Sequence, residues 1–212
     1  MRNTLKLINI FILCKVINHL TMKIIVYDFE TTGLNPFHDK IIDFCFYDLL
    51  TGKKVEGLVN PEREISSKIT EITGITNEQL SVSEPIEHHI QKLRDFFNTE
   101  ETIYFVAHNG DGFDKHFLNE LHKNFTLFKD KNKVYHIDTI PLSKKYIPDQ
   151  YSFKLVSLCK RFGIQPGGHR AFTDTNALQK LYKHLLRIIE TKSDYSYDYL
   201  LNNPNVVYDL IY

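Results

Sequence analysis

The sequence predicts an α/β fold in which a mixed sheet, made of an antiparallel hairpin and parallel strands, is flanked by helices. Three observations predict it. The apolar run Ile24-Ile25-Val26 opens the patterned part of the chain and indicates a buried strand. Two further strand-like segments meet at the turn pair Thr51-Gly52, as in a hairpin. After them, segments with helical spacing alternate with short apolar runs.

The predicted strands are short, and they are either apolar or rich in β-branched and aromatic residues. They span residues 23–29, 41–47, 54–59, 102–107 and 135–138. Asn60-Pro61 ends the third strand, because proline cannot continue a ladder of hydrogen bonds. The strand at 102–107 is continuously apolar, which indicates that both of its faces are covered.

Helices are predicted where apolar residues recur at helical spacing. These segments are residues 85–98, 114–123, 154–162 and 173–191. Pro85 suits a first helical turn, and Gly163 suits a helix end. The tail, residues 193–212, is rich in tyrosine and lacks a clear period, so we expect a short helix packed on the domain or a contact surface.

Composition is typical of a globular protein, with 42% hydrophobic and 25% charged residues in a chain of 212. The 26 basic and 26 acidic residues cancel, so no global field draws nucleic acid to it, although bound cations can change the local sign. Cys14, Cys45 and Cys159 are scattered and odd in number. We therefore expect reduced thiols in an intracellular protein that is not secreted.

Residues 1–21 precede the first predicted strand. Their apolar run ends at Lys15, well short of the ~20 residues that a membrane span needs. A small-residue cleavage site does not follow. Because Met22 stands directly before the strand, we expect the domain to start there. The leader is then an appendage or an over-extended start, rather than a membrane anchor or a targeting segment.

Asp28 and Glu30 lie two positions apart at the end of the first strand. Side chains on a strand alternate between its faces, so the two carboxylates point the same way and repel each other. A cation between them would relieve the repulsion, and Mg²⁺ and Mn²⁺ prefer oxygen ligands. Taken alone, the pair would still be better explained as solvated acids at an exposed strand end.

Acidic residues recur at two later positions with strand or helix boundaries nearby. Asp111 and Asp114 follow the strand at 102–107, and His169 stands five residues before Asp174 at a predicted helix start. Helix capping would explain Asp174 by itself. The order of these motifs along the chain is what makes them informative.

The order Asp-x-Glu at 28–30, His-Asn-Gly-Asp-x-Phe-Asp at 108–114 and His-x4-Asp at 169–174 resembles the DEDDh, DnaQ-like family of 3′→5′ exonucleases. Asn60-Pro61, the segment 72–76 and Asp138-Thr139 also follow the family order. The resemblance covers about residues 22–189. It implies a ribonuclease H-like fold, with an exonuclease domain at 22–192 and a tail at 193–212.

Two subfamilies share these features. The motif at 108–114 is one residue longer than in bacterial proofreading subunits and looks like that of the three-prime repair exonucleases. The segments 58–61 and 72–76 look as much like proofreading domains of the polymerase III epsilon type. The resemblance therefore identifies the superfamily more firmly than the subfamily.

The resemblance implies roles for individual residues. Asp28, Glu30, Asp114 and Asp174 would bind two Mg²⁺ or Mn²⁺ ions, and His169 would act as general base. Substrate contacts are implied for Phe113 beside the scissile bond and for four other residues. Backbone amides near Thr31 and Thr32 would meet the terminal 3′-hydroxyl, and Leu34 and Ile72 would pack on the terminal base. For Leu34 and Ile72 the alternative is ordinary core packing.

Neighbouring residues are expected to have structural or weaker roles. Asp138 should cap or brace a strand end, and His108 should be structural. Asp111 is close to Asp114, but the family register favours Asp114. A basic rim for backbone phosphates is also expected. Its candidate residues are Lys144, Lys145, Lys154, Lys160, Arg161 and Arg170.

The predicted function is metal-dependent 3′→5′ hydrolysis of single-stranded or frayed DNA, releasing nucleoside 5′-monophosphates. An exoribonuclease of the same fold is the first alternative, since the sequence offers no clear reader of the 2′-hydroxyl. A polymerase-associated proofreading subunit is the second. A catalytically dead relative is disfavoured because all five catalytic positions are filled. Expected partners are single-stranded DNA 3′ ends, with RNA, a polymerase or a homodimer through the edge strand 54–59 as alternatives; a membrane is not expected.

Overall fold

A computed structural model describes residues 22–212, so the leader at 1–21 lies outside the described residues. The chain forms one five-stranded mixed sheet in the order β3-β2-β1-β4-β5. β1 pairs antiparallel with β2 and parallel with β4, which confirms the predicted hairpin and parallel strands. The strands are β1 (Met22–Thr31), β2 (Ile41–Asp48), β3 (Lys54–Leu58), β4 (Thr102–Ala107) and β5 (Val134–Asp138).

All four predicted helices are present, and the tail forms two short ones. The helices are α2 (Ser67–Thr73), α3 (Asn77–Ser81), α4 (Ile86–Phe97), α5 (Asp114–Phe125), the 3₁₀ turn η1 (Lys131–Lys133), α6 (Thr139–Tyr146), α7 (Leu155–Arg161), α8 (Ala171–Lys192), α9 (Tyr197–Asn202) and α10 (Pro204–Asp209). Three helices, α2, α3 and α6, have no counterpart among the segments predicted to be helical. Each has at most eight residues, too few for a clear helical period.

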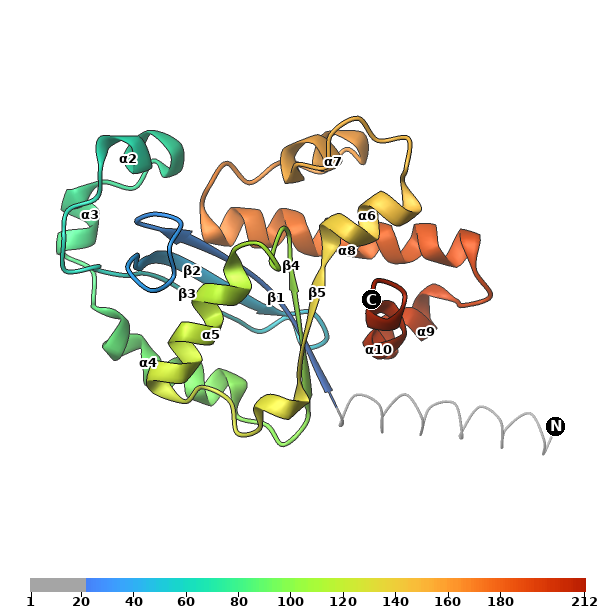
Figure 1. Ribbon diagram of the computed structural model, residues 1–212, viewed down its shortest axis with the longest axis horizontal. Helices are drawn as coiled ribbons and strands as arrows, with labels where there is room; N and C mark the ends of the chain where they lie inside the picture. Colours follow the sequence, from blue (N-terminus) through green and yellow to red (C-terminus); the bar gives the residue numbers. More distant parts are fainter. Residues whose placement is uncertain (1–21) are drawn as a thin grey trace.

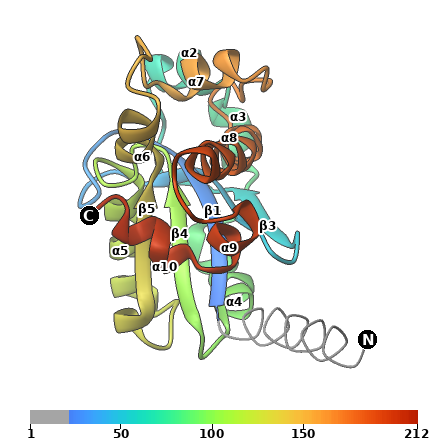
Figure 2. The same cartoon turned by 90° about the vertical axis from the view of Figure 1, so that its right-hand side faces the viewer.

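Helices cover both faces of the sheet, and β1 shows which covers which. Ile24 and Val26 pack in one core cluster with α8, whereas Ile25 and Tyr27 pack in a second cluster with α4 and α5. Figures 1 and 2 show α8 on one side of the strands and α4 and α5 on the other. Asp28 and Glu30 continue the alternation of Ile24 and Val26, so they face α8.

β1 extends beyond its parallel neighbour. Its pairing with β4 ends at Val26, whereas its pairing with β2 continues to Thr31. The last residues of β1 therefore have β2 on one side and no strand on the other. Such an opening at the carboxyl end of a strand in an α/β sheet is where binding sites commonly form.

The tail packs on the domain through helices, which was one of its two expected arrangements. Leu200 and Val207 are fully buried in the cluster that contains α8. The Tyr208 ring meets the Tyr135 ring on β5 edge-on, at 5.4 Å between centroids. Figure 2 shows α9 and α10 lying over the strands beside α8. The proposed division at residue 192 thus separates two segments that share one core.

Three smaller expectations concern edges, membranes and thiols. β3 is an edge strand, as expected. Within residues 22–212, every helix is too short or too polar to cross a membrane. Cys45 and Cys159 are buried free thiols, and Cys14 lies outside the described residues.

Candidate active site

The five predicted catalytic residues line one cavity of about 850 Å³. Asp28 and Glu30 come from the end of β1, Asp114 begins α5, and Asp174 lies in the first turn of α8. His169 reaches the same cavity from the loop before α8. Side chains separated by more than a hundred residues are thus brought together at the open carboxyl end of β1.

A backbone hydrogen bond holds Asp114 at the cavity. The Phe29 N–H donates to Asp114 Oδ1 at 3.1 Å. β1 has already left β4 at this point, so the carboxylate takes the place of a missing strand partner. Burial raises the pKa of Asp114 to about 7, although the Phe29 amide favours its charged form.

A tight loop places His169 beside Asp174. A Cβ atom on Gly167 would stand 2.3 Å from Asp174 Oδ1, so only glycine fits there. Gly168 and His169 both have positive φ, 92° and 60°, which turns the exposed imidazole back over the cavity. One ligand atom each of Glu30, His169 and Asp174 lies within 4.8 Å of the others.

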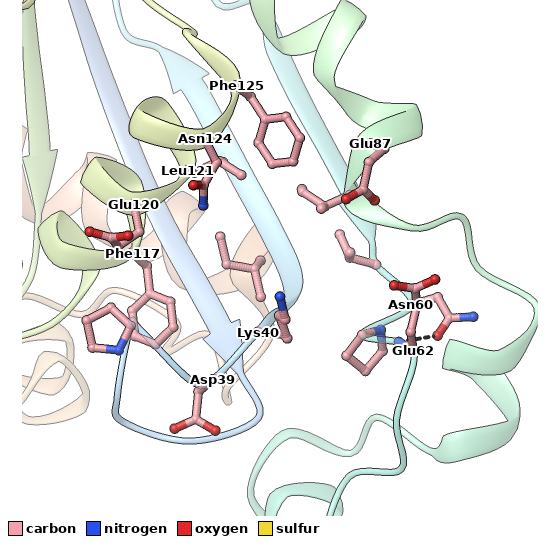
Figure 3. A pocket seen from close by; sticks show the side chains of 15 residues that line it. Asp39, Lys40, Asn60, Glu62, Glu87, Phe117, Glu120, Leu121, Asn124 and Phe125 are labelled. Atoms are coloured by element: carbon pink, nitrogen blue, oxygen red, sulfur yellow. Dashed lines mark hydrogen bonds between the residues drawn. The ribbon is translucent and has the colours of Figure 1, made fainter.

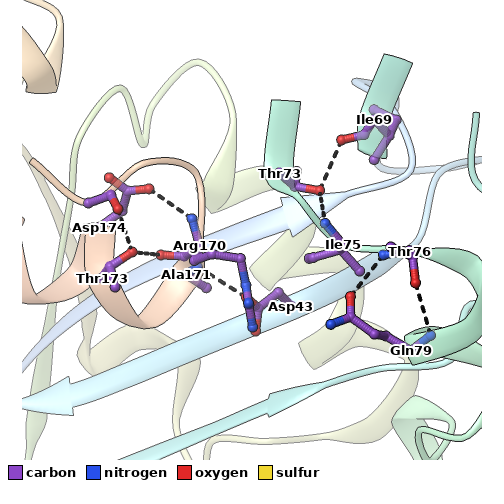
Figure 4. Close-up of polar contacts among 11 residues, drawn as sticks. Asp43, Ile69, Thr73, Ile75, Thr76, Gln79, Arg170, Ala171, Thr173 and Asp174 are labelled. Atoms are coloured by element: carbon purple, nitrogen blue, oxygen red, sulfur yellow. Dashed lines mark hydrogen bonds and ion pairs between the residues drawn. The ribbon is translucent and has the colours of Figure 1, made fainter. Parts of the chain in front are cut away.

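An ion pair fixes this loop to the sheet, as Figure 4 shows. Asp43 on β2 is buried, and its Oδ2 accepts from Arg170 Nε at 2.9 Å and from Ala171 N at 3.2 Å. The Arg170 N–H in turn donates to Asp174 Oδ2 at 3.2 Å. Sequence reasoning missed Asp43; an acid inside the otherwise apolar Ile-Ile-Asp-Phe-Cys-Phe run was the available signal.

The carboxylates raise one another's pKa. Burial, followed by the Asp114 and Glu30 charges, raises the pKa of Asp28 well above its usual value. Burial and then the Asp174 charge raise the pKa of Glu30 to about 8. Burial also raises the pKa of Asp174. Without a cation the site favours bound protons, which is the electrostatic condition for binding divalent ions.

The donor set fits Mg²⁺ or Mn²⁺. Four carboxylates offer oxygen atoms, the ligands that these ions prefer. The imidazole of His169 is the one nitrogen donor in the group formed with Glu30 and Asp174. Neither cysteine of the described chain lines the cavity.

Of the predicted substrate residues, only Phe113 lines the cavity. Leu34 is 83% exposed and Ile72 is 41% exposed, so core packing is the wrong explanation for both. Ile72 lies on α2, and Gly74, with φ 70°, ends that helix. Figure 4 shows the hydrogen bonds that make this turn, including the capping box of Thr76 and Gln79 on α3.

Thr31 and Thr32 lie at the end of β1 but outside the cavity lining. Thr31 is buried. The Thr32 N–H donates to the Lys40 carbonyl at 2.8 Å, and its hydroxyl donates to Asp39 Oδ1 at 3.0 Å. The Thr32 amide is therefore already engaged within the protein.

Asp138 and His108, for which structural roles were expected, make hydrogen bonds within the protein, and His108 also lines the cavity. Asp138 Oδ1 accepts from Ile140 N at 2.8 Å, which caps α6, and from Asn109 N at 3.1 Å. His108 bridges the Thr139 hydroxyl and the Phe153 carbonyl at 2.8 and 2.9 Å. These contacts hold the loop that leads to Asp114.

Asp111 lies outside the cavity lining. Its carboxylate pairs with Lys115 at 3.1 Å and accepts a hydrogen bond from Tyr212. Asp114 lines the cavity and Asp111 does not, which is the arrangement that the family register favours.

A separate pocket of about 100 Å³ lies between α5 and the residues that follow β3. Figure 3 shows its lining, in which Asp39, Glu87 and Glu120 stand among apolar side chains. None of the predicted site residues lines it. This pocket is much smaller than the cavity that holds the five predicted catalytic residues.

Comparisons with known proteins agree with this geometry. The sequence model of the RNase T exonuclease family matches residues 25–182. DNA polymerase III PolC-type from Bacillus subtilis is 34% identical over 184 residues, covering 84% of this chain and 12% of the relative. The same protein type from Thermotoga petrophila is 36% identical over 170 residues, covering 78% and 12%.

Solved structures agree on the fold. Escherichia coli exonuclease I in complex with single-stranded DNA, in a zinc-bound form, superposes with a TM-score of 0.68 at 16% identity, covering 86% of this chain and 43% of that one. Exonuclease I from Methylocaldum szegediense gives 0.66 at 20% identity, covering 86% and 43%. At such identities the likeness concerns the fold alone.

The chain spans about an eighth of the length of the PolC-type relatives, which contain much besides this domain. The family match nevertheless runs from the middle of β1 into α8 and includes all five residues that gather at the cavity. This chain belongs to the exonuclease family, as a DnaQ-like member with a ribonuclease H-like mixed sheet.

Proposed function

We propose that this chain hydrolyses the terminal phosphodiester bond at the 3′ end of single-stranded or frayed DNA and releases nucleoside 5′-monophosphates. The observation that supports this best is the meeting of Asp28, Glu30, Asp114 and Asp174 with His169 in one cavity. Membership of the exonuclease family supports the reaction class.

The carboxylates are proposed to hold two divalent cations, Mg²⁺ or Mn²⁺. When bound, such a pair supplies an activated water and stabilises the leaving oxyanion. After burial, the charges of Asp114 and Glu30 raise the pKa of Asp28 most, so Asp28 would be the ligand common to both ions. Glu30 and Asp174, with ligand atoms within 4.8 Å, would complete one site, and Asp114 would serve the other.

His169 is proposed as the general base. It is exposed, it lies beside Glu30 and Asp174, and an imidazole can accept a proton near neutral pH. Phe113 would contact the nucleotide within the cavity. Leu34 and Ile72, both exposed, would pack on the terminal base. Contact of the 3′-hydroxyl with the Thr31 and Thr32 backbone stays a prediction, and to make it the Thr32 N–H would have to give up its hydrogen bond to the Lys40 carbonyl.

The test is a cleavage assay with 5′-labelled single-stranded DNA and RNA of matched sequence in Mg²⁺. We expect stepwise shortening of DNA from the 3′ end, abolished by EDTA. Asp114→Asn should abolish shortening, whereas Asp111→Asn, three residues away but outside the cavity lining, should retain it. Faster shortening of RNA would favour the exoribonuclease alternative.

Proofreading is a second candidate, favoured by the PolC-type relatives, whose name is that of a DNA polymerase. It predicts faster removal of a mismatched than of a matched 3′ nucleotide on a primer–template duplex, since a mismatch frays the end. Equal rates on both duplexes would argue against it. Self-association through β3 stays a prediction, to be tested by measuring the mass of the protein in solution.

A further inference from the structure

The cavity has a second wall, which contains two members of the expected basic rim, Lys144 and Lys154. It is formed by α6 and by the segment that enters α7, above the strands in Figure 1. Its lining residues are Ile140, Lys144, Phe153, Lys154, Leu155 and Val156. The wall therefore combines two ammonium groups with four apolar side chains.

Lys144 and Lys154 are both exposed, and neither side chain makes an ion pair or a hydrogen bond with another residue of 22–212. Three of the other four members of the expected basic rim are engaged elsewhere, and the fourth, Lys160, lies outside the cavity lining. Lys145 donates to the Leu210 carbonyl at 2.7 Å, and Arg161 pairs with Asp149 at 2.9 Å. Arg170 pairs with Asp43, so it serves the loop before α8.

The charges of the two walls differ. The carboxylates of the cavity belong to Asp28, Glu30, Asp114 and Asp174. Its ammonium groups belong to Lys144 and Lys154, on the other wall. Phosphates of a nucleic-acid strand are repelled by free carboxylates and attracted by lysines. Because the whole chain has no net charge, attraction of a strand must come from such local groups.

The apolar residues of this wall fit the other half of a nucleotide. Val156 is 42% exposed, and Phe153 is half-buried beside it. Exposed apolar and aromatic faces accept any base, because every base has a π-face. A surface that combines lysines with such residues suits the phosphates and bases of a single strand.

We propose that Lys144 and Lys154 bind backbone phosphates of single-stranded DNA on the 5′ side of the scissile bond, with Phe153 and Val156 against the bases. This inference rests on the proposed function and names the path by which the strand leaves the cavity. The carboxylate wall acts on the terminal linkage, and the lysine wall holds the strand.

Salt dependence of binding tests the proposal. A labelled oligodeoxythymidine is titrated in Ca²⁺ by fluorescence anisotropy, in a His169→Gln background that slows cleavage. For single strands, each phosphate contact contributes about 0.7 to the slope of log affinity against log salt. Lys144→Gln and Lys154→Gln should each lower the slope by about 0.7 and weaken binding about fivefold at ~0.1 M salt.

Matched variants make the result specific. Lys160→Gln, on the same helix as Val156 but outside the cavity lining, should leave slope and affinity unchanged. Lys144→Arg and Lys154→Arg should retain the slope, because they keep the charge. All these lysines are exposed, so their thermal unfolding should match that of the parent.

The outcomes separate the two proposals. If the parent chain shortens DNA but Lys144→Gln and Lys154→Gln bind like Lys160→Gln, the lysine wall is wrong and the proposed function stands. If the parent chain shortens neither DNA nor RNA but the slope depends on the two lysines, the wall is supported and the proposed function is wrong.

Discussion

Asp43 and Arg170 lie 127 residues apart in the sequence and form an ion pair with 2.9 Å between Oδ2 and Nε. The pair ties the middle of β2 to the residue that follows His169. The Arg170 amide also donates to the Asp174 carboxylate. The loop before α8 therefore connects Asp174, a candidate metal ligand, to the sheet.

Asp43→Ala should weaken both folding and metal binding. It leaves the Arg170 guanidinium and the Ala171 amide without their acceptor, which should lower the free energy of unfolding by about 1.5–3 kcal/mol. Mn²⁺ affinity should fall, since the loop carrying Asp174 loses its anchor. Urea unfolding and Mn²⁺ titration measure the two effects.

Asp149→Ala is the matched control for this substitution. Asp149 pairs with Arg161 at the same 2.9 Å, but on the surface. Its loss should cost about 0–1 kcal/mol and leave Mn²⁺ affinity unchanged. If the two substitutions change unfolding free energy and Mn²⁺ affinity equally, Asp43 does not position the loop.

The cavity carboxylates should make the metal-free protein less stable as the pH rises, whereas buried histidines such as His136, whose pKa burial lowers to about 4, act in the opposite direction. The pKa of Glu30 is about 8 when folded, against 4.5 for an unperturbed glutamate, so the folded state holds a proton that the unfolded state has released. The stabilising contribution is complete below pH 4.5 and is lost as the pH rises through about 8. Raised pKa values of Asp28 and Asp114 act in the same direction.

Chemical unfolding in EDTA at several pH values between 5 and 8 checks this prediction. The double variant Asp28→Asn with Glu30→Gln should flatten the dependence, because the amides have no proton to lose. Saturating Mn²⁺ should stabilise the protein more at pH 8 than at pH 5, since cations and protons compete for the carboxylates. A pH dependence in EDTA that the double variant leaves unchanged would contradict the assignment.

His169→Gln distinguishes a general base from a metal ligand. A base contributes about 10²–10⁴-fold to the rate, so kcat should fall by that factor. Mn²⁺ affinity should stay within about twofold of the parent, because the carboxylates bind the ion. If Mn²⁺ affinity falls together with kcat, His169 is a ligand. His88→Gln, on the exposed side of α4, should change neither quantity.

Leu34→Ala and Leu200→Ala make the same chemical change at opposite kinds of position. Leu34 is 83% exposed, so its truncation should leave stability unchanged but raise KM for single-stranded DNA roughly fivefold, or about 1 kcal/mol of lost apolar contact. Leu200 is fully buried, so its truncation should cost about 2–5 kcal/mol of unfolding free energy.

Unfolding and steady-state kinetics on both variants check the pair. An unchanged KM for Leu34→Ala would contradict the proposed contact of Leu34 with the terminal base. A stability loss below 1 kcal/mol for Leu200→Ala would show that the tail contributes little to the core.

The sequence by itself determined the strands, the long helices and the five residues that gather at the cavity. Apolar alternation along β1 placed Asp28 and Glu30 on one face, and the motif order supplied Asp114, His169 and Asp174. These features are local or carried by ordered motifs, so they can be recognised without knowing what lies next to them.

Tertiary structure alone decided the partners of these residues. The sequence did not pair Asp43 with Arg170, and it did not separate Lys144 and Lys154 from the engaged members of the basic rim. It also did not reveal that the tail shares the α8 core. Each of these depends on contacts between residues far apart in the chain, which are set by packing rather than by local pattern.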